Sequence, residues 1–269
     1  MSALSRRRAF SPSLVPTLPD SAIILPPRVE QAIWHGTDLG SACSTVVPTG
    51  FAALDAVLPG GGWPCRSLTD ILQAQPSVLE WRLLGPALRT VVQEGQTVVV
   101  VGPPKEPHMV GLRHIGMDEH HFVWIKADTP AHRLWVTEQL VKSNSCGALV
   151  CWLPQARPEQ LRRLQMCAHG CDAPVFLFRP ETVAVDACAA PLRLQVSFGA
   201  DWELAVRVLK RRGSLLEEVL RLPSVPGGLD PAIAPRARKP SVLLPTREAT
   251  HALGRTAVAD YDRSSVVSH

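Results

Sequence analysis

The sequence predicts an α/β protein with a doubly wound, mostly parallel sheet. Short runs made only of apolar residues alternate with longer segments whose apolar residues recur at helical spacing, the pattern of a sheet covered by helices on both faces. After Phe178 the pattern changes to strict alternation, which predicts antiparallel strands at one edge of this sheet. With 46% hydrophobic and 19% charged residues, the 269-residue composition suits one globular domain with tails.

Three regions are expected along the chain. Residues 1–27 are rich in serine and proline and contain Arg6-Arg7-Arg8, so we expect a flexible basic N-terminal arm. Residues 28–222 carry the regular apolar patterns and form the core domain, which begins with a short docking helix at 28–35. Residues 223–269 are rich in proline and arginine and are expected to form a flexible, largely disordered C-terminal tail.

The parallel strands are predicted from short apolar runs. Gln96–Gly102 is the clearest, because its four consecutive valines are typical of a strand buried on both faces. The glycines Gly60-Gly61-Gly62 are expected to form a turn before the first core strand, with backbone conformations that a side chain would forbid. A further strand is expected at 66–72.

Helices are predicted between these strands. Residues 78–94 place leucines and valines at helical spacing. Asp128-Thr129-Pro130 supplies a cap and a first-turn proline for a helix that continues to about residue 143. A third helix is expected at 157–169. The inner face of the helix after Pro130 is expected to contain Ala131, Leu134, Trp135 and Val141.

The last part of the core is expected to be antiparallel. Residues 192–198 alternate with period two, residues 199–201 form a turn, and residues 202–209 alternate again, which predicts a hairpin. A third strand is expected at 215–222.

Several segments, in this order and at this spacing, resemble the RecA-like recombinase core, and within it the ImuA group of bacterial translesion-synthesis accessory proteins. The first is Thr49–Pro64, TGFAALDAVLPGGGWP. Leu112–Asp118 and Phe122–Thr129 are similar to the RecA turn, third strand and following helix start. Gly147–Pro154 and Ala173–Arg179 are similar to the two strands that follow. The resemblance covers most of the chain and implies a RecA-like fold, which also ends in antiparallel strands at the sheet edge.

The chemistry of a RecA-like ATPase is missing from these segments. Where G-x-x-x-x-G-K-[ST] should follow the first core strand, Gln73–Arg82 has neither glycine nor lysine. Trp152 occupies the position of the Mg²⁺-holding aspartate, and Gly102–Lys105 the turn where the catalytic glutamate is expected. Asp70 and Glu106 lie nearby as lone substitutes. We therefore expect no catalytic residue, no nucleotide cofactor and no ATPase activity.

The resemblance implies a non-catalytic adaptor of damage-induced (SOS) mutagenesis. Its implied partners are an ImuB-like Y-family polymerase homologue and an error-prone C-family DNA polymerase, with RecA and DNA as further contacts. Two alternatives stay open. One is an ATP-dependent, DNA-binding RecA-like protein with an altered nucleotide site. The other is a SulA-like cell-division inhibitor, a group that shares the degraded core, although the long basic tail argues against it.

Two sequence features are candidate contact sites for a partner or nucleic acid. Lys210, Arg211 and Arg212 close a strand at a place that resembles the RecA strand facing a neighbouring subunit's nucleotide. Two readings of this basic cluster stay open: a solvated hairpin tip, or a contact to phosphates or a carboxylate-rich partner. Val242, Leu243 and Leu244 form an apolar island in the tail and a candidate docking peptide.

Five of the seven tryptophans are assigned to two groups. Trp152 and Trp63 stand at a strand end or in a loop and are candidate partner contacts. Trp81, Trp135 and Trp202 fall at amphipathic positions and are expected to be packing residues.

Cysteine usage and hydropathy predict a cytoplasmic protein. The seven cysteines are scattered and odd in number, which fits a reduced compartment, and no apolar run is long enough to span a bilayer. Cys167, His169 and Cys171 lie close together, but a structural zinc needs four ligands, so no metal is expected. Asp118–His121 is read as a turn with solvated side chains. The net charge of +4 is too small to identify a partner.

Overall fold

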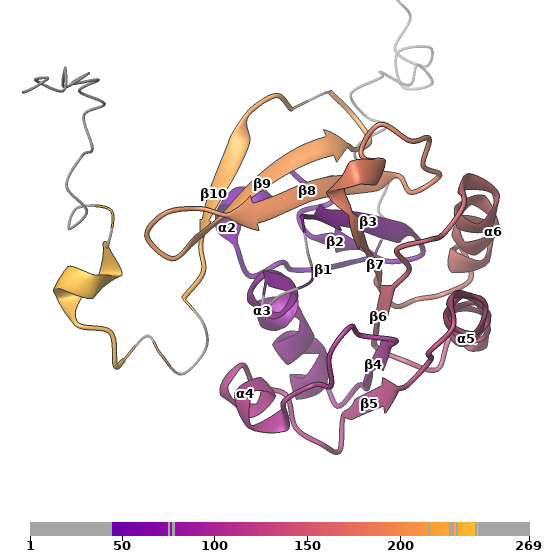
Figure 1. Ribbon diagram of the computed structural model, residues 1–269, viewed down its shortest axis with the longest axis horizontal. Coiled ribbons are helices and arrows are strands. Elements are labelled where there is room, and N and C mark those ends of the chain that lie inside the picture. Colours follow the sequence, from indigo (N-terminus) through magenta and orange to yellow (C-terminus); the bar gives the residue numbers. More distant parts are fainter. Residues whose placement is uncertain are drawn as a thin grey trace, which may run out of the picture.

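The computed structural model describes residues 45–74, 76, 79–214, 216–225, 229, 231–239 and 241. In this part of the chain, helices cover both faces of one large sheet (Figure 1). The predicted arm at 1–27, the docking helix at 28–35 and the candidate docking peptide Val242-Leu243-Leu244 lie outside the described residues.

The large sheet has eight strands in the order β10-β9-β8-β3-β7-β6-β4-β5. The strands from β8 to β5 run parallel, and β9 and β10 are antiparallel additions at one edge. The predicted mostly parallel sheet with antiparallel strands at one edge is thus confirmed. The strands are β3 (Leu68–Gln73), β4 (Val98–Val101), β5 (Phe122–Ile125), β6 (Ala148–Trp152), β7 (Val175–Pro180), β8 (Leu192–Phe198), β9 (Glu203–Lys210) and β10 (Val219–Pro223).

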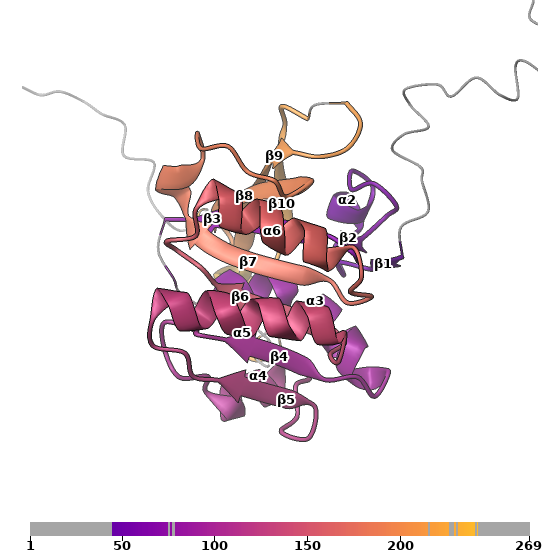
Figure 2. The same cartoon turned by 90° about the vertical axis from the view of Figure 1, so that its right-hand side faces the viewer.

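The main helices lie on opposite faces of this sheet. α3 (Leu79–Gln93) and α4 (Met109–His114) cover one face, and α5 (Pro130–Ser143) and α6 (Pro158–Ala168) lie side by side on the other (Figures 1 and 2). The helices predicted at 78–94, 129–143 and 157–169 are confirmed. Among the described residues, no helix is both long and apolar enough to cross a bilayer. The shorter elements are β1 (Val46–Val47), β2 (Trp63–Pro64), α2 (Ala52–Asp55), η2 (Glu181–Val183) and η3 (Pro235–Arg238).

The all-valine strand β4 shows why a central parallel strand can be apolar at every position. Successive side chains of a strand point to opposite faces, so each strand contributes to two cores. Val98 and Val100 pack in the core under α3, whereas Val99 and Val101 pack in the core under α5 and α6. All four valines are buried.

α5 buries a different face from the predicted one. Trp135 is 59% exposed and Ala131 is also exposed, so of the predicted inner residues only Val141 is fully buried. The prediction was wrong because it selected apolar residues, whereas polar side chains occupy half of the buried positions. The buried residues of this helix are Val136, Thr137, Glu138 and Val141.

Glu138 joins α5 to α6 through two ion pairs. Its Oε1 accepts hydrogen bonds from Lys142 Nζ at 2.5 Å and from Arg163 Nη2 at 2.6 Å. The hydrogen bond from Lys142, followed by that from Arg163, holds the pKa of Glu138 below its usual value. Because the folded-state pKa is the lower one, this contribution is present above the ordinary pKa of a glutamate and is lost as the pH falls through the lowered value.

Glu138→Gln is expected to lower the free energy of unfolding by about 1 kcal/mol at neutral pH, since both cationic partners are well exposed and screened. The difference from the unmodified protein should shrink as the pH is lowered to about 3, where Glu138 becomes protonated as well. Urea unfolding at both pH values measures it. The exposed Glu159→Gln, in the first turn of α6, is the matched control. A difference that stays constant with pH would contradict the ion-pair account.

The glycine run before β2 forms the predicted turn. Gly60 and Gly61 have φ values of 85° and 80°, in the left-handed region that favours glycine. A Cβ added at Gly62 would lie 2.5 Å from Val47 O, so the neighbouring strand β1 excludes a side chain there. The prediction of a turn in this stretch is confirmed.

The predicted hairpin is formed by β8 and β9, and β10 adds the predicted third strand. The chain reverses through Asp201 and Trp202, whose φ values of 54° and 62° match the turns that join twisted antiparallel strands.

Residues after β10 contact the core, unlike the flexible tail predicted from residue 223. Ser224 is buried; its N donates to Trp202 O at 2.8 Å, and its O accepts from Arg82 Nε at 2.7 Å. Trp202 Nε1 in turn donates to Ala237 O at 2.9 Å, which holds η3. These contacts were not predicted, because a proline-rich composition does not reveal side-chain anchors such as Arg82.

Candidate functional site

The carboxyl ends of the parallel strands meet at one edge of the sheet, where open α/β sheets bind their ligands. At this edge, Gln73 ends β3, Trp152 ends β6, and Glu80 lies in the first turn of α3. Glu80 is 2% exposed, and its Oε1 accepts hydrogen bonds from Gln73 Nε2 at 2.7 Å and Trp152 Nε1 at 3.3 Å. One buried carboxylate and its two hydrogen-bond donors therefore occupy the corner between the first core strand and the helix that follows it.

Aromatic rings pack beside this cluster. Trp152 stacks on Phe178 with ring centroids 5.2 Å apart, and its centroid lies 6.2 Å from that of Trp81. Trp81 also packs near Phe122, with ring centroids 6.3 Å apart. Its half-buried position confirms Trp81 as a packing residue.

Trp152, predicted as a partner contact, is only 5% exposed, so its indole is buried and not at the surface as the sequence interpretation assumed. The sequence interpretation treated a strand end as a surface position. Trp152 instead ends a central strand, flanked by β4 and β7, and its indole is held between Phe178 and Glu80. It is a core residue of the carboxyl edge.

The turn after β4 is covered by the side chain of Arg133. Gly102 has a φ of 57°, and a Cβ added there would lie 2.7 Å from Arg133 Cδ, so the Arg133 side chain lies directly against this turn. Arg133 Nε donates to Ala127 O at 2.6 Å, which fixes the guanidinium in place. The side chain that covers this turn is therefore a cation that is hydrogen-bonded to the backbone. Glu106, the predicted lone substitute in this turn, is exposed.

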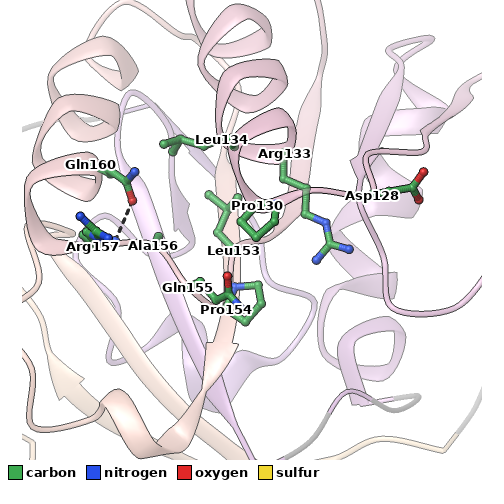
Figure 3. Close-up of a pocket in the computed structure, with 11 residues that line it drawn as sticks. Asp128, Pro130, Arg133, Leu134, Leu153, Pro154, Gln155, Ala156, Arg157 and Gln160 are labelled. Carbon is green, nitrogen blue, oxygen red and sulfur yellow. Dashed lines mark hydrogen bonds between the residues drawn. The ribbon is translucent and has the colours of Figure 1, made fainter.

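A pocket of about 600 Å³ opens beside this edge, between the first turns of α5 and α6 (Figure 3). Figure 3 shows Arg133 and Asp128 on one side of it and Gln155 and Arg157 on the other. Gln160 Oε1 accepts from Arg157 N at 2.8 Å, so the start of α6 is already capped. Among the described residues, the lining includes one carboxylate and no serine or threonine, so this part of the chain does not supply there the pair of Mg²⁺ ligands that P-loop hydrolysis uses.

A buried ion cluster lies in the middle of the sheet around Asp70. Asp70 is 0% exposed, and its Oδ2 accepts from Arg193 Nε at 2.9 Å and from Arg179 Nη1 at 3.3 Å. The Cys188 thiol is a third donor at 3.4 Å, and burial, followed by the Asp70 carboxylate, raises the pKa of this thiol. Asp70 is therefore the shared acceptor of a buried structural cluster.

The two arginines of this cluster anchor the loops that follow β6 and β7. Arg179 Nη2 donates to Ala156 O at 3.2 Å, after β6. Arg193 reaches the segment after β7, where its guanidinium donates to three carbonyl oxygens at 2.5–2.9 Å. Sequence reasoning missed this cluster, although the signal was present: Asp70, Arg179 and Arg193 are charged residues inside otherwise apolar strands.

The predicted basic cluster lies at the opposite, amino edge of the sheet, because β9 runs antiparallel to β8. Lys210 Nζ donates to Cys188 O at 2.8 Å. Arg211 Nε donates to Ser214 O at 2.7 Å, and its Nη1 donates to Val57 O. Arg212 is exposed. Two of the three basic side chains are thus hydrogen-bonded to the backbone. The structure therefore matches neither a fully solvated hairpin tip nor a fully free contact site.

Arg211 and Arg212 line a second pocket of about 160 Å³. Arg66, just before β3, and His169, just after α6, line the same pocket. The sequence interpretation considered His169 only as part of a metal-binding motif and did not single out Arg66. Arg66 lies just before β3 and His169 just after α6, so both residues are at the amino edge of the sheet. The order of the strands could therefore have indicated that these two residues lie close together.

The remaining tryptophans correct two further predictions. Trp63 is fully buried, with its ring edge-on to Phe176 at 5.3 Å, so it is not a surface contact. Trp135, predicted to pack, is the exposed one. Trp202 is half-buried and hydrogen-bonded to η3, in agreement with a packing role.

The other short motifs behave as local structure. In the part of the chain that the structure describes, no three His, Cys, Asp or Glu side chains gather as metal ligands; of the Cys167–Cys171 motif, Cys171 is buried and His169 is exposed. Asp118 Oδ1 accepts from His120 N at 2.8 Å and His121 N at 3.0 Å, which confirms the predicted turn.

Comparison with known proteins gives no family assignment: no protein-family model and no curated protein matches the chain.

Proposed function

We propose that this chain is a non-catalytic RecA-like accessory protein of damage-induced mutagenesis. It acts as an adaptor in a translesion-synthesis complex with an ImuB-like Y-family polymerase homologue and an error-prone C-family DNA polymerase. In this role the chain makes and breaks no bond, and its chemistry is recognition between surfaces.

The arrangement of the resembling segments supports the RecA-like part of the proposal. Leu112–Asp118 spans the end of α4 and the next turn, Phe122–Ile125 is β5, and Thr129 caps α5 by accepting from His132 N at 3.2 Å. The antiparallel strands stand at one edge, where the resembled core also carries them.

The observation that carries the non-catalytic part is the Gln73–Glu80–Trp152 cluster. A triphosphate needs backbone amides and a lysine between the first core strand and its helix. This corner instead holds a buried carboxylate and a large indole. Since like charges repel strongly where water is excluded, Glu80 opposes a phosphate there, and the Trp152 ring occupies the volume.

Titration with Mg-ATP and Mg-ADP tests this part. We expect no saturable heat of binding at micromolar nucleotide, and no phosphate release when single-stranded DNA is added. An active RecA recombinase under the same conditions is the positive control. Saturable micromolar binding would favour the alternative of an ATP-dependent DNA-binding protein with an altered site.

Capture of the polymerase homologue tests the adaptor part. Intact protein is compared with a chain that ends at Ser241, which removes Val242-Leu243-Leu244 but keeps Ser224 and η3 in their contacts. We expect the shorter chain to capture the ImuB-like protein at least ten-fold more weakly while its thermal unfolding is unchanged. Equal capture would move the binding site onto the core. No capture by the intact chain would contradict the adaptor function.

A further inference from the structure

We infer that the pocket at the amino edge of the sheet binds an acidic side chain of a protein partner. We call it the arginine pocket and define it by Arg66, His169, Arg211 and Arg212. This inference rests on the proposed adaptor function and adds the chemistry of one contact surface. The pocket lies at the opposite end of the parallel strands from the Gln73–Glu80–Trp152 cluster.

The charges of the arginine pocket are only partly balanced within the described chain. Arg66 is paired, since its Nη2 lies 2.6 Å from Asp172 Oδ1. Arg211 is held by uncharged oxygens, those of Ser214 and Val57. No aspartate or glutamate lines the pocket among the described residues, and Arg212 is exposed. Two guanidinium groups are therefore left to attract an anion.

The pocket is held in shape before any ligand arrives. The hydrogen bonds of Arg211 to three oxygens of the chain fix its side chain. Arg66 has a φ of 56°, a left-handed conformation that is unusual for a residue with a side chain, and its N donates to Cys171 O at 3.0 Å. Such conformations persist where the surrounding structure determines them and are concentrated at ligand sites. A pre-positioned guanidinium loses less entropy when it binds.

The size and walls of the pocket favour a carboxylate side chain over nucleic acid. Its volume of about 160 Å³ is well below that of pockets that hold drug-sized ligands or nucleosides. The walls include Pro59, Pro64 and Pro191, which are rigid and apolar and suit the methylene groups of a glutamate. Nucleic-acid binding depends on several phosphate contacts along a track, and this recess offers a single point.

A peptide titration tests the inference directly. The probe is a fluorescein-labelled nonapeptide of alternating glutamate and leucine, with glutamine replacing glutamate in a matched peptide, and an oligothymidylate of 20 nucleotides as the nucleic-acid arm. We expect saturable binding of the glutamate peptide that weakens as salt is raised, with amide shifts at Ser67 and Leu192 in the NMR spectrum, because these residues line the pocket. The glutamine peptide should not bind.

Charge reversal locates the site. Arg212→Glu, at an exposed position, is expected to weaken glutamate-peptide binding at least ten-fold. Arg207→Glu removes the same charge from an exposed position of β9 outside the pocket and should change it less than two-fold. The inference is overturned if neither peptide binds, if both bind equally, or if Arg212→Glu affects only the oligothymidylate. Purified components are used, so such a failure leaves the capture result with the polymerase homologue standing.

Discussion

Asp70→Ala is expected to lower the free energy of unfolding by about 3–5 kcal/mol, because it leaves buried charges without their counter-ion. Arg179 and Arg193 are both almost fully buried, and Asp70 is the carboxylate that they share. A loss of this size is a large fraction of the 5–15 kcal/mol that typically stabilises a domain. Urea unfolding followed by circular dichroism measures it.

Asp172→Ala is the matched control for this prediction. Asp172 also pairs with an arginine, Arg66, but both side chains are well exposed, at 61% and 59%. Exposed pairs contribute about 0–1 kcal/mol, so this variant should stay close to the unmodified protein. Equal losses for the two variants would contradict the conclusion that burial makes the Asp70 cluster structural.

Trp152→Ala is expected to cost about 3–5 kcal/mol, the usual loss when a buried tryptophan is truncated in a core. Trp152→Phe retains a ring on Phe178 and loses one of the two hydrogen bonds that Glu80 Oε1 accepts, so a smaller loss of about 1–3 kcal/mol is expected from that hydrogen bond and the smaller ring. The same unfolding measurement separates the two variants.

Trp135→Ala removes the same side chain from an exposed position and should change stability by less than about 0.5 kcal/mol. This control shows whether the effect of Trp152→Ala comes from lost packing in the core or from a lost contact with a partner. If Trp152→Ala left stability unchanged and abolished capture of a partner instead, Trp152 would be a contact residue and its burial would be contradicted.

Elements whose signal is local were predictable from the sequence. The four valines of β4 and the Thr129-Pro130 start of α5 determine strand and helix through neighbouring residues alone. The lack of the G-x-x-x-x-G-K-[ST] motif in Gln73–Arg82 is a property of the sequence itself and needs no structure.

What could not be predicted depends on pairs of residues that are far apart in the chain. Glu80 and Trp152 meet only after the strands have assembled, and neither residue type alone indicates that the other will be its partner. The inner face of α5 was misjudged for the same reason, because Glu138 is acceptable inside only when Arg163 of another helix reaches it. The arginine pocket likewise requires the order of the strands.

The arginines bound to Asp70 also tie the segments after β6 and β7 to the interior. Because buried side chains hold these segments, their backbone is already ordered in the free protein. A molecule that binds at this end of the sheet would therefore meet a preformed surface. Association there would lose little backbone freedom.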